Sequence, residues 1–292
     1  MMQMQLYRRV PQGWAVLAVL GMVLMVGSSE ARAQDEKKVG WFDEAELSLV
    51  ATDGNAEAET LGFTNTLRRV WEDAEFSLKA SGLRAESTTR TLRAVLEPSG
   101  TVRVFDESNT DLTAEHYSLS GRYRRQISER FFWFAGLGWE RNEFAGFDPR
   151  ISAEGGVGHQ WFKTEKASFR TDYAVTYTHQ EDVVPTPGRS EDFAGVRFAW
   201  DYRRQLTPST EYTNTLQVDE NLDDTSDLRA DLNQAIAVAI NKKLALKVSL
   251  QLLFDNQPAV EAVPIEPALE DVVLVELEEL DSTLKVALVV HF

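Results

Sequence analysis

From residue 40 onward, the sequence alternates between apolar and polar side chains over long runs. Alternation with a period of two is typical of a β-strand whose two faces meet different surroundings. The runs extend over ten to fourteen residues, about twice the ~5–6 residues of an ordinary globular strand. A tilted strand needs roughly 9–11 residues to cross a membrane. The pattern therefore predicts an all-β, transmembrane antiparallel up-and-down barrel. The clearest runs begin at Ala45, Ala74, Val196, Leu244 and Leu284.

The polar face of these runs carries many charged residues, which sets the orientation of the strands. Burying so many charges in a dry sandwich core would be prohibitive, whereas a wet lumen accepts them. We therefore expect apolar side chains to face lipid and charged side chains to face the interior. Acidic and basic residues are nearly balanced on the inward face, which favours cross-strand ion pairs that partly fill the lumen. The predicted luminal charges are Glu154, Asp172, Asp201, Arg122, Arg170, Arg197 and Arg203.

The runs divide into about twelve strands. We expect them near 42–53, 58–69, 71–83, 112–127, 130–141, 150–162, 166–179, 192–205, 209–219, 227–240, 243–255 and 273–292. Their connections alternate between short turns and longer loops, as in a barrel of the outer membrane. Residues 88–109 read as an extra hairpin that extends strands three and four, and the alternative is two further membrane strands, giving fourteen.

The N-terminal residues have the features of a cleaved signal peptide. Arg8 and Arg9 precede an apolar run from Trp14 to Val26, and Ala31-Arg32-Ala33 supplies a small-x-small cleavage site. We expect a signal peptide over 1–33, export through the inner membrane and an outer-membrane barrel over 34–292. A single-pass anchor is the alternative.

The charge distribution restricts the partners. A formal charge of −16 argues against a nucleic-acid partner, because phosphate binding needs a basic surface. Acidic residues gather in the long loops and basic residues in the short turns. The acidic loops could share divalent cations with lipopolysaccharide, or they are an ordinary solvated loop set. The expected partners are outer-membrane lipid and lipopolysaccharide, with small ions or solutes in the lumen.

The sequence offers few candidates for catalysis or for a cofactor. The absence of cysteine excludes disulfides, thiolate catalysis and cysteine metal sites. His116 and Ser118 share a strand face, as a base and a nucleophile would, but alternation points both into the lumen, away from lipid. The four histidines lie on separate predicted strands, which gives no support to a metal site. Gly155-Gly156-Val157-Gly158 precedes no helix and reads as strand flexibility. We expect no catalytic residues, no metal and no cofactor.

Two further features match a membrane barrel. Aromatic residues lie mostly near strand ends, where aromatic belts occur: Trp71, Trp133, Trp139, Trp161, Trp200, Tyr117, Tyr123, Tyr202 and Tyr212. The last strand ends in an alternating pattern that resembles the signal read by the barrel-assembly machinery: Leu284, Val286, Leu288, Val290 and Phe292.

Several segments resemble the YdiY-like, salt-induced outer-membrane protein family, a domain of unknown function. They are Trp41 to Asn55, Glu115 to Tyr123, Phe134 to Asp148, Ile151 to Gln160 and the closing strand, with departures at Thr88–Asn109 and Pro258–Pro267. The resemblance covers nearly all of the mature chain. It implies a single outer-membrane barrel linked by name to salt stress, and it supplies no catalytic residues.

Three hypotheses for function follow. The first is a structural barrel or a narrow, weakly selective pore linked to envelope or salt stress. The second is a solute-specific channel, although a channel for acidic sugars would be expected to show a clear basic excess. The third is a lipid-modifying enzyme, which rests only on His116 and Ser118.

Overall fold

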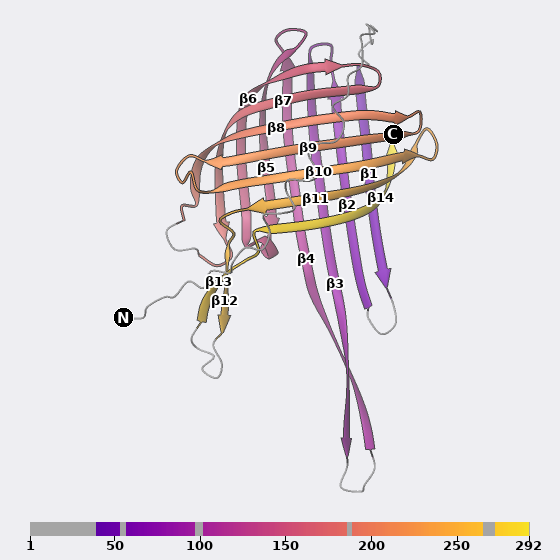
Figure 1. The fold of residues 1–292 in the computed structure, drawn as a ribbon, viewed down its shortest axis with the longest axis vertical. Helices are drawn as coiled ribbons and strands as arrows, with labels where there is room; N and C mark the ends of the chain where they lie inside the picture. Colours follow the sequence, from indigo (N-terminus) through magenta and orange to yellow (C-terminus); the bar gives the residue numbers. More distant parts are fainter. Residues whose placement is uncertain (1–38, 53–56, 97–101, 186–188, 265–271, 292) are drawn as a thin grey trace.

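The structure is a computed structural model that describes residues 39–52, 57–96, 102–185, 189–264 and 272–291. Within these residues, twelve strands close into an antiparallel barrel in the order β1-β14-β11-β10-β9-β8-β7-β6-β5-β4-β3-β2. Every neighbour in the barrel pairs antiparallel, and the strands cross the picture in two broad directions because the wall curves strongly (Figure 1). The predicted fold class and the strand number of twelve are confirmed.

The barrel strands are long, as the sequence predicts. They are β1 Gly40–Thr52, β2 Glu57–Val70, β3 Ala74–Leu96, β4 Val102–Gln126, β5 Phe131–Asn142, β6 Phe147–Lys163, β7 Ala167–Asp182, β8 Asp192–Thr207, β9 Thr210–Asn221, β10 Leu228–Ala239, β11 Leu244–Asp255 and β14 Leu280–His291. A 3-10 helix, η1, covers Glu143–Ala145, and β12 Val260–Pro264 pairs with β13 Val272–Glu276 outside the barrel.

The two ends of the barrel differ in their connections. One end, here called the short-turn end, has the connections at 71–73, 127–130, 164–166, 208–209 and 240–243. The opposite end, here called the loop end, is where β1, β3, β5, β7, β9 and β11 finish. The described chain both enters and leaves the barrel at the short-turn end, because the number of barrel strands is even.

Strands β3 and β4 continue beyond the barrel wall as a two-stranded ribbon. The two strands pair from Ala74↔Arg125 to Leu96↔Val102, with one register shift at Ala85/Glu86. Such an irregularity bends a strand pair and changes its twist, and the ribbon projects from the loop end (Figure 1). Residues 88–96 and 102–109 therefore extend strands three and four, and the fourteen-strand alternative is wrong.

The predicted last strand, 273–292, is wrong at its beginning. Residues Val272–Glu276 leave the barrel as β13 and pair with β12, from Val260↔Glu276 to Pro264↔Val272. The apolar Val272–Val275 run looks like a barrel strand in sequence, but this local hairpin takes up its backbone hydrogen bonds. Leu277 N–H also donates to the Ala259 carbonyl at 2.9 Å, and Ala259 is buried.

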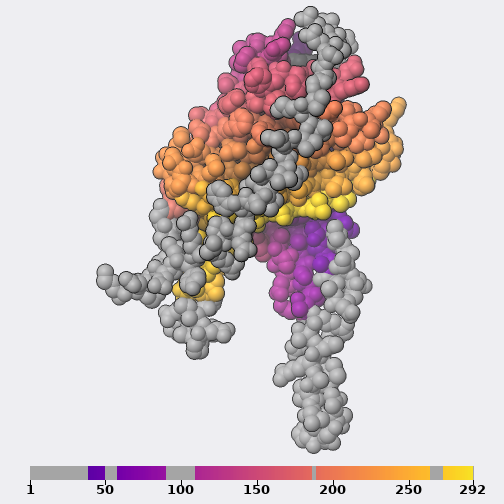
Figure 2. All heavy atoms as spheres, in the orientation of Figure 1, coloured from indigo at the N-terminus to yellow at the C-terminus, as the bar shows by residue number. Residues whose placement is uncertain are grey.

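The barrel wall has an apolar outer face. Leu137, Val175 and Leu284 are 69%, 67% and 72% exposed, whereas the inward-facing Phe134 and Ala287 are each 2% exposed. Side chains of β8 to β11 and β14 form one continuous outer band, orange to yellow in Figure 2. Exposure of so much apolar surface around a closed wall is typical of contact with lipid.

Aromatic rings form a belt near the short-turn end. On the outer face, Tyr123 contacts both Trp71 and Trp133, with ring centroids 6.5 and 5.5 Å apart. Tyr202 continues the belt between Phe169 and Tyr212, at 6.4 and 6.3 Å. Of the predicted belt residues, Trp161 and Trp200 also lie here, with ring contacts to His159 and Phe198.

The closing seam of the barrel is the shortest pairing between wall strands. Strand β1 pairs with β14 over four residue pairs, from Glu44↔His291 to Leu47↔Leu288. The same strand pairs with β2 along its whole length, from Gly40↔Val70 to Thr52↔Ala58. Backbone hydrogen bonding is therefore sparse at the seam.

Candidate functional site: an ion-paired barrel interior

Alternation along five of the six neighbouring strands β4 to β9 brings charged side chains to one inner wall. Arg122 lies on β4, Glu154 on β6, Asp172 on β7, Arg197 on β8 and Asp219 on β9. Each lies at an inward position, since the residues on either side of it along the strand face outward. The sequence predicts this placement for four of the five, and Asp219 is not among the predicted luminal charges.

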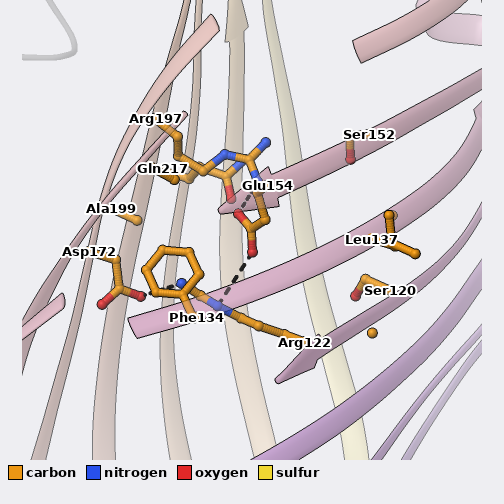
Figure 3. Close-up of a pocket in the computed structure, with 13 residues that line it drawn as sticks. Ser120, Arg122, Phe134, Leu137, Ser152, Glu154, Asp172, Arg197, Ala199 and Gln217 are labelled. Atoms are coloured by element: carbon orange, nitrogen blue, oxygen red, sulfur yellow. Dashed lines mark hydrogen bonds and ion pairs between the residues drawn. The ribbon is translucent and has the colours of Figure 1, made fainter. Parts of the chain in front are cut away.

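Arg122 is the centre of a network that spans non-neighbouring strands (Figure 3). Its Nη2 lies 2.8 Å from Asp172 Oδ2, and its Nε lies 3.4 Å from Glu154 Oε1. Because β4 is separated from β7 by two strands, the Arg122 side chain spans the inner faces of β5 and β6 to reach Asp172. The side chain therefore takes up part of the lumen.

Glu154 connects Arg122 to a second arginine. Arg197 Nη1 lies 2.9 Å from Glu154 Oε2, and Arg197 Nε donates to Asp219 Oδ1 at 2.6 Å. Glu154 is 12% exposed and Asp172 is 7% exposed, so both carboxylates have little contact with water. Charges buried this far need partners, and the two arginines provide them.

An aromatic pair lies under the arginines. The Phe134 ring centroid is 3.7 Å from Arg122 Cζ, and the Phe132 centroid is 5.0 Å from Arg124 Cζ. Stacking of a guanidinium on an aromatic face is favourable and fixes the orientation of the arginine. Phe132, Phe134 and Ala174 form a small buried apolar cluster inside the barrel.

Glycines on β6 make room for these rings. A Cβ on Gly156 would lie 2.8 Å from Phe134 Cζ, and one on Gly158 would lie 2.7 Å from Asp172 Oδ1 and overlap the Phe132 ring. By contrast, a Cβ on Gly155 would meet no atom within 4 Å, because this residue faces outward. The glycine-rich segment, expected to supply strand flexibility, therefore permits close packing of side chains in the lumen.

A cavity of about 210 Å³ adjoins the network. Ser120, Ser152, Glu154, Arg197 and Gln217 contribute polar groups to its lining, and Phe134 contributes an apolar one. At about 30 Å³ for each water, the cavity has room for several. The inner wall is therefore narrowed but retains polar space.

The remaining predicted luminal residues pair nearer the short-turn end. Arg170 Nη2 lies 3.2 Å from Asp201 Oδ2, and Arg203 Nε lies 3.5 Å from Glu211 Oε1. The structure therefore brings Arg122, Glu154, Asp172 and Arg197 into one network. Arg170, Asp201 and Arg203 lie in a separate layer.

Glu46 on β1 is the centre of a second set of ion pairs, on the opposite wall. It contacts Lys247 Nζ on β11 directly, and Lys285 Nζ on β14 lies 3.7 Å from its Oε2. Glu46 is 7% exposed. Its inward position was predictable from alternation, but its two partners were not, because they join β1 to strands that are far away in sequence.

A third cluster, near the loop end, was missed by sequence reasoning. Arg150 Cζ lies 3.8 Å from the Phe147 ring centroid and Arg229 Cζ lies 4.9 Å from that of Phe193. Gln180 Oε1 accepts from both arginines, at 2.7 and 3.4 Å. An arginine beside an inward aromatic residue recurs in this barrel, and this pattern could have located the cluster.

His116 and Ser118, the candidate catalytic pair, each contact a different residue rather than each other. Ser118 Oγ is 2.7 Å from Ser81 Oγ, and His116 Nε2 is 3.8 Å from Glu140 Oε2. Both side chains lie at inward positions. In the part of the chain that the structure describes, no group of three or more His, Asp or Glu side chains is arranged to hold a metal ion.

Side-chain hydrogen bonds join two connections at the loop end, the one between β9 and β10 and the one after β11. Gln257 Nε2 donates to Ser226 Oγ at 2.6 Å and to Asp224 Oδ2 at 3.3 Å, and Asn256 Nδ2 donates to the Ser226 carbonyl at 2.6 Å. Hydrogen bonds from the Ser226 side chain and backbone, followed by that from Gln257, hold the pKa of Asp224 below its ordinary value. We refer to Asp224, Ser226, Asn256 and Gln257 as the loop latch.

Among the described residues, no helix is long and apolar enough to cross a membrane.

The sequence model of a family described as "Protein of unknown function, DUF481" matches residues 45–292. The chain belongs to this family. A curated relative of this DUF481 chain, the uncharacterized protein YdiY of Escherichia coli strain K12, is 26% identical over 153 residues. The matched segment is 52% of this chain and 57% of the relative's length. The predicted resemblance to YdiY-like proteins is confirmed.

Solved structures similar to this DUF481 chain include outer-membrane porins. The NanC porin aligns over 85% of this chain and 98% of its own, at 9% identity and a TM-score of 0.45. The KdgM porin, solved in complex with disordered oligogalacturonate, aligns over 87% and 99%, at 8% identity and a TM-score of 0.41. The translocator domain of the autotransporter NalP from Neisseria meningitidis aligns over 88% and 90%, at 9% identity and a TM-score of 0.44.

Proposed function

We propose that this DUF481 chain spans the outer membrane as a narrow pore for small ions and polar solutes, with weak selectivity. The observation that carries the proposal is the Arg122 network. Its ion pairs join strands that are not neighbours, over the buried Phe134 ring, beside a polar cavity. A lumen obstructed in this way would pass ions slowly.

The strand number supports a partly filled interior. An eight-stranded barrel is just filled by its side chains, and barrels of 16–18 strands leave an aqueous channel. Twelve strands lie between these limits. Arg122, Lys247 and Lys285 retain 30%, 25% and 24% of their side-chain exposure, so water reaches the charged groups inside.

The outer face supports a location in the membrane. The apolar band and the aromatic belt suit lipid and headgroups, respectively. We propose that residues 1–33, which lie outside the described residues, are a cleaved signal peptide, and that the loop end faces the cell exterior. Leu284, Val286 and Leu288 are exposed on β14, where the assembly machinery would read them together with Val290 and Phe292.

A conductance measurement tests the pore. The purified barrel is reconstituted in planar bilayers across a range of salt concentrations, and we expect small, weakly selective openings. Arg122→Ala should enlarge the conductance, because it removes a long side chain that spans the inner faces of β5 and β6 and takes up part of the lumen. A complete absence of conductance in the unaltered barrel would overturn the pore and leave a structural barrel.

Arg125→Ala is the matched control. Arg125 lies three residues further along β4, also in an ion pair, with its Nε 3.0 Å from Asp73 Oδ2, but it faces outward and is 56% exposed. Its removal should leave the conductance unchanged. An equal change in both variants would mean that the Arg122 network does not set the size of the pore.

We propose no catalytic role. His116 and Ser118 have separate partners and lie at inward positions, where membrane lipid would not reach them. The proposed link to salt or envelope stress comes from the family resemblance. It is tested by comparing growth of a strain lacking the gene with its parent at high salt, where equal growth would contradict it.

A further inference from the structure

We propose that the short-turn end of the lumen holds a binding site for a small soluble polyanion that carries phosphate or carboxylate groups. The site rests on the cavity described below and deepens the pore function proposed above. Because binding can be measured without conduction, the two proposals can fail separately.

A cavity of about 350 Å³ opens at this end, separate from the one beside Arg122. Its volume lies within the ~300–1,000 Å³ typical of ligand pockets. Inward-facing residues of β2, β3, β4, β6, β7, β8 and β9 line it, and the β6–β7 turn forms its rim. A solute in the lumen reaches this space, whereas lipid outside the wall does not.

The cavity lining has more basic than acidic groups. Six basic side chains line it (Arg68, Arg124, Lys163, Lys166, Arg170 and Arg203) against four acidic ones (Glu75, Glu165, Asp201 and Glu211). Three of the acids are paired with lining arginines: Glu75 with Arg124, Asp201 with Arg170, and Glu211 with Arg203. The excess of two positive charges favours an anion.

Several cations in the cavity have unused capacity. Arg170 contacts Asp201 through only one of its two terminal nitrogens. Arginine carries five N–H donors and binds phosphate or carboxylate oxygens in pairs. In the described part of the chain, no carboxylate forms an ion pair with Lys163 or Lys166, although both are exposed at the rim.

The two ends of the barrel differ in charge, so a polyanion would reach the site more easily from one end than from the other. The loop end carries exposed carboxylates at Glu181, Asp223 and Asp224, which would repel a polyanion approaching from that side. The basic short-turn end would attract it. An anion in this cavity would lie one layer below Arg122 and Arg197, the next cations along the lumen.

The rim lysines can be removed without disturbing the turn that holds them. Thr164 N–H donates to the Ala167 carbonyl at 2.8 Å, and Thr164 Oγ1 accepts from Ala167 N–H at 3.0 Å. Neither bond involves a lysine side chain. Lys163→Gln/Lys166→Gln should therefore fold normally, as checked by the heat-dependent gel shift of a closed barrel.

The test is isothermal titration of inorganic pyrophosphate into the intact barrel in an uncharged detergent at low salt. We expect saturable binding that weakens as salt is added. Lys163→Gln/Lys166→Gln should bind about tenfold more weakly, the equivalent of about 1.4 kcal/mol. Succinate should compete with pyrophosphate, because both present paired anionic oxygens.

Lys242→Gln/Lys243→Gln is the matched control. These two lysines are also exposed in a short turn at the same end, but they lie outside the cavity. Their removal should change the affinity less than twofold. Equal weakening by both double variants would show general charge attraction and overturn the site, as would the absence of binding to the unaltered barrel.

Conductance separates the two proposals. A barrel that conducts but does not bind pyrophosphate would overturn the site and retain the pore. One that binds pyrophosphate but does not conduct would retain the site and overturn the pore.

Discussion

The guanidinium carbon of Arg122 lies over the Phe134 ring inside the barrel, 3.7 Å from the ring centroid. The aromatic ring is 2% exposed, and the arginine also contacts Asp172 and Glu154. A single residue therefore connects the apolar packing of the inner wall with its charge network. Changes at either residue should affect both the stability and the permeability of the barrel.

The Arg122–Asp172 pair should show energetic coupling. Arg122→Met leaves the nearly buried Asp172 without its arginine, which should destabilise the barrel by about 1–3 kcal/mol. Asp172→Asn removes the charge that needs a partner, so the double variant should be more stable than the two single losses predict. Urea titration of folding into vesicles measures all four proteins, and strict additivity would contradict the coupling.

Phe134→Ala should remove a packed ring from the inner wall. Loss of a buried phenylalanine costs about 3–5 kcal/mol in protein cores. The cost here should lie near the lower end, because the cavity beside the ring already has room for water. The same substitution should increase the single-channel conductance, and a smaller conductance would count against a lumen narrowed by this ring.

Gly156 and Gly155 offer a matched pair of alanine substitutions. A Cβ at Gly156 would overlap the Tyr173 carbonyl oxygen and crowd Phe134, whereas one at Gly155 meets nothing within 4 Å. Gly156→Ala should destabilise the barrel by about 1–3 kcal/mol through overpacking, and Gly155→Ala should be near neutral. Equal effects in a urea titration would mean that the lumen is not tightly packed here.

The exposed face of β14 should be sensitive to charge. Val286 is 48% exposed and faces outward, so Val286→Arg should cost roughly 2–4 kcal/mol if it lies near the middle of the bilayer. Substitution of the buried Ala287 by a larger residue tests steric space in the lumen instead.

The terminal residue should matter for assembly. Deletion of Phe292, which lies outside the described residues, should slow assembly in cells, whereas Phe292→Tyr should assemble normally. Normal insertion of the truncated chain would contradict a terminal signal.

The loop latch should weaken in acid. The folded pKa of Asp224 is lowered by bonds from Ser226 and Gln257, so the latch contributes stability above the unfolded pKa of this carboxyl. That contribution is lost as the pH falls through the lower folded value. Ser226→Ala should raise the Asp224 pKa toward its ordinary value, which carbon-detected NMR would measure, and an unchanged pKa would contradict the proposed cause.

Most of the barrel wall could be predicted from sequence, because a period of two and a short-turn, long-loop rhythm are both local properties. The strand pairs agree with the expected boundaries within a few residues along β5 to β11. Residues 273–276 were misplaced because Val272–Val275 has the composition of a wall strand, and only its pairing with β12 shows otherwise.

The interior could be predicted only as a set of inward-facing charges. Alternation places Arg122 and Asp172 on the same face of the sheet, but their contact depends on how strongly the wall between β4 and β7 curves. The contact also depends on the Phe134 ring on β5, under the Arg122 guanidinium, and on the β6 glycines that leave room for this ring. The partners of Glu46 could not be predicted for the same reason, because they lie on strands distant from β1 in sequence.

Glu46 has a mechanical consequence for the closing seam. The backbone contributes four residue pairs between β1 and β14, and Glu46 adds side-chain contacts to Lys285 on β14 and to Lys247 on β11. One carboxylate on β1 thus holds β14 across the seam and also reaches β11, the strand on the far side of β14. Lateral opening of the wall between β1 and β14 would therefore require the Glu46–Lys285 and Glu46–Lys247 ion pairs to break as well as the backbone pairs.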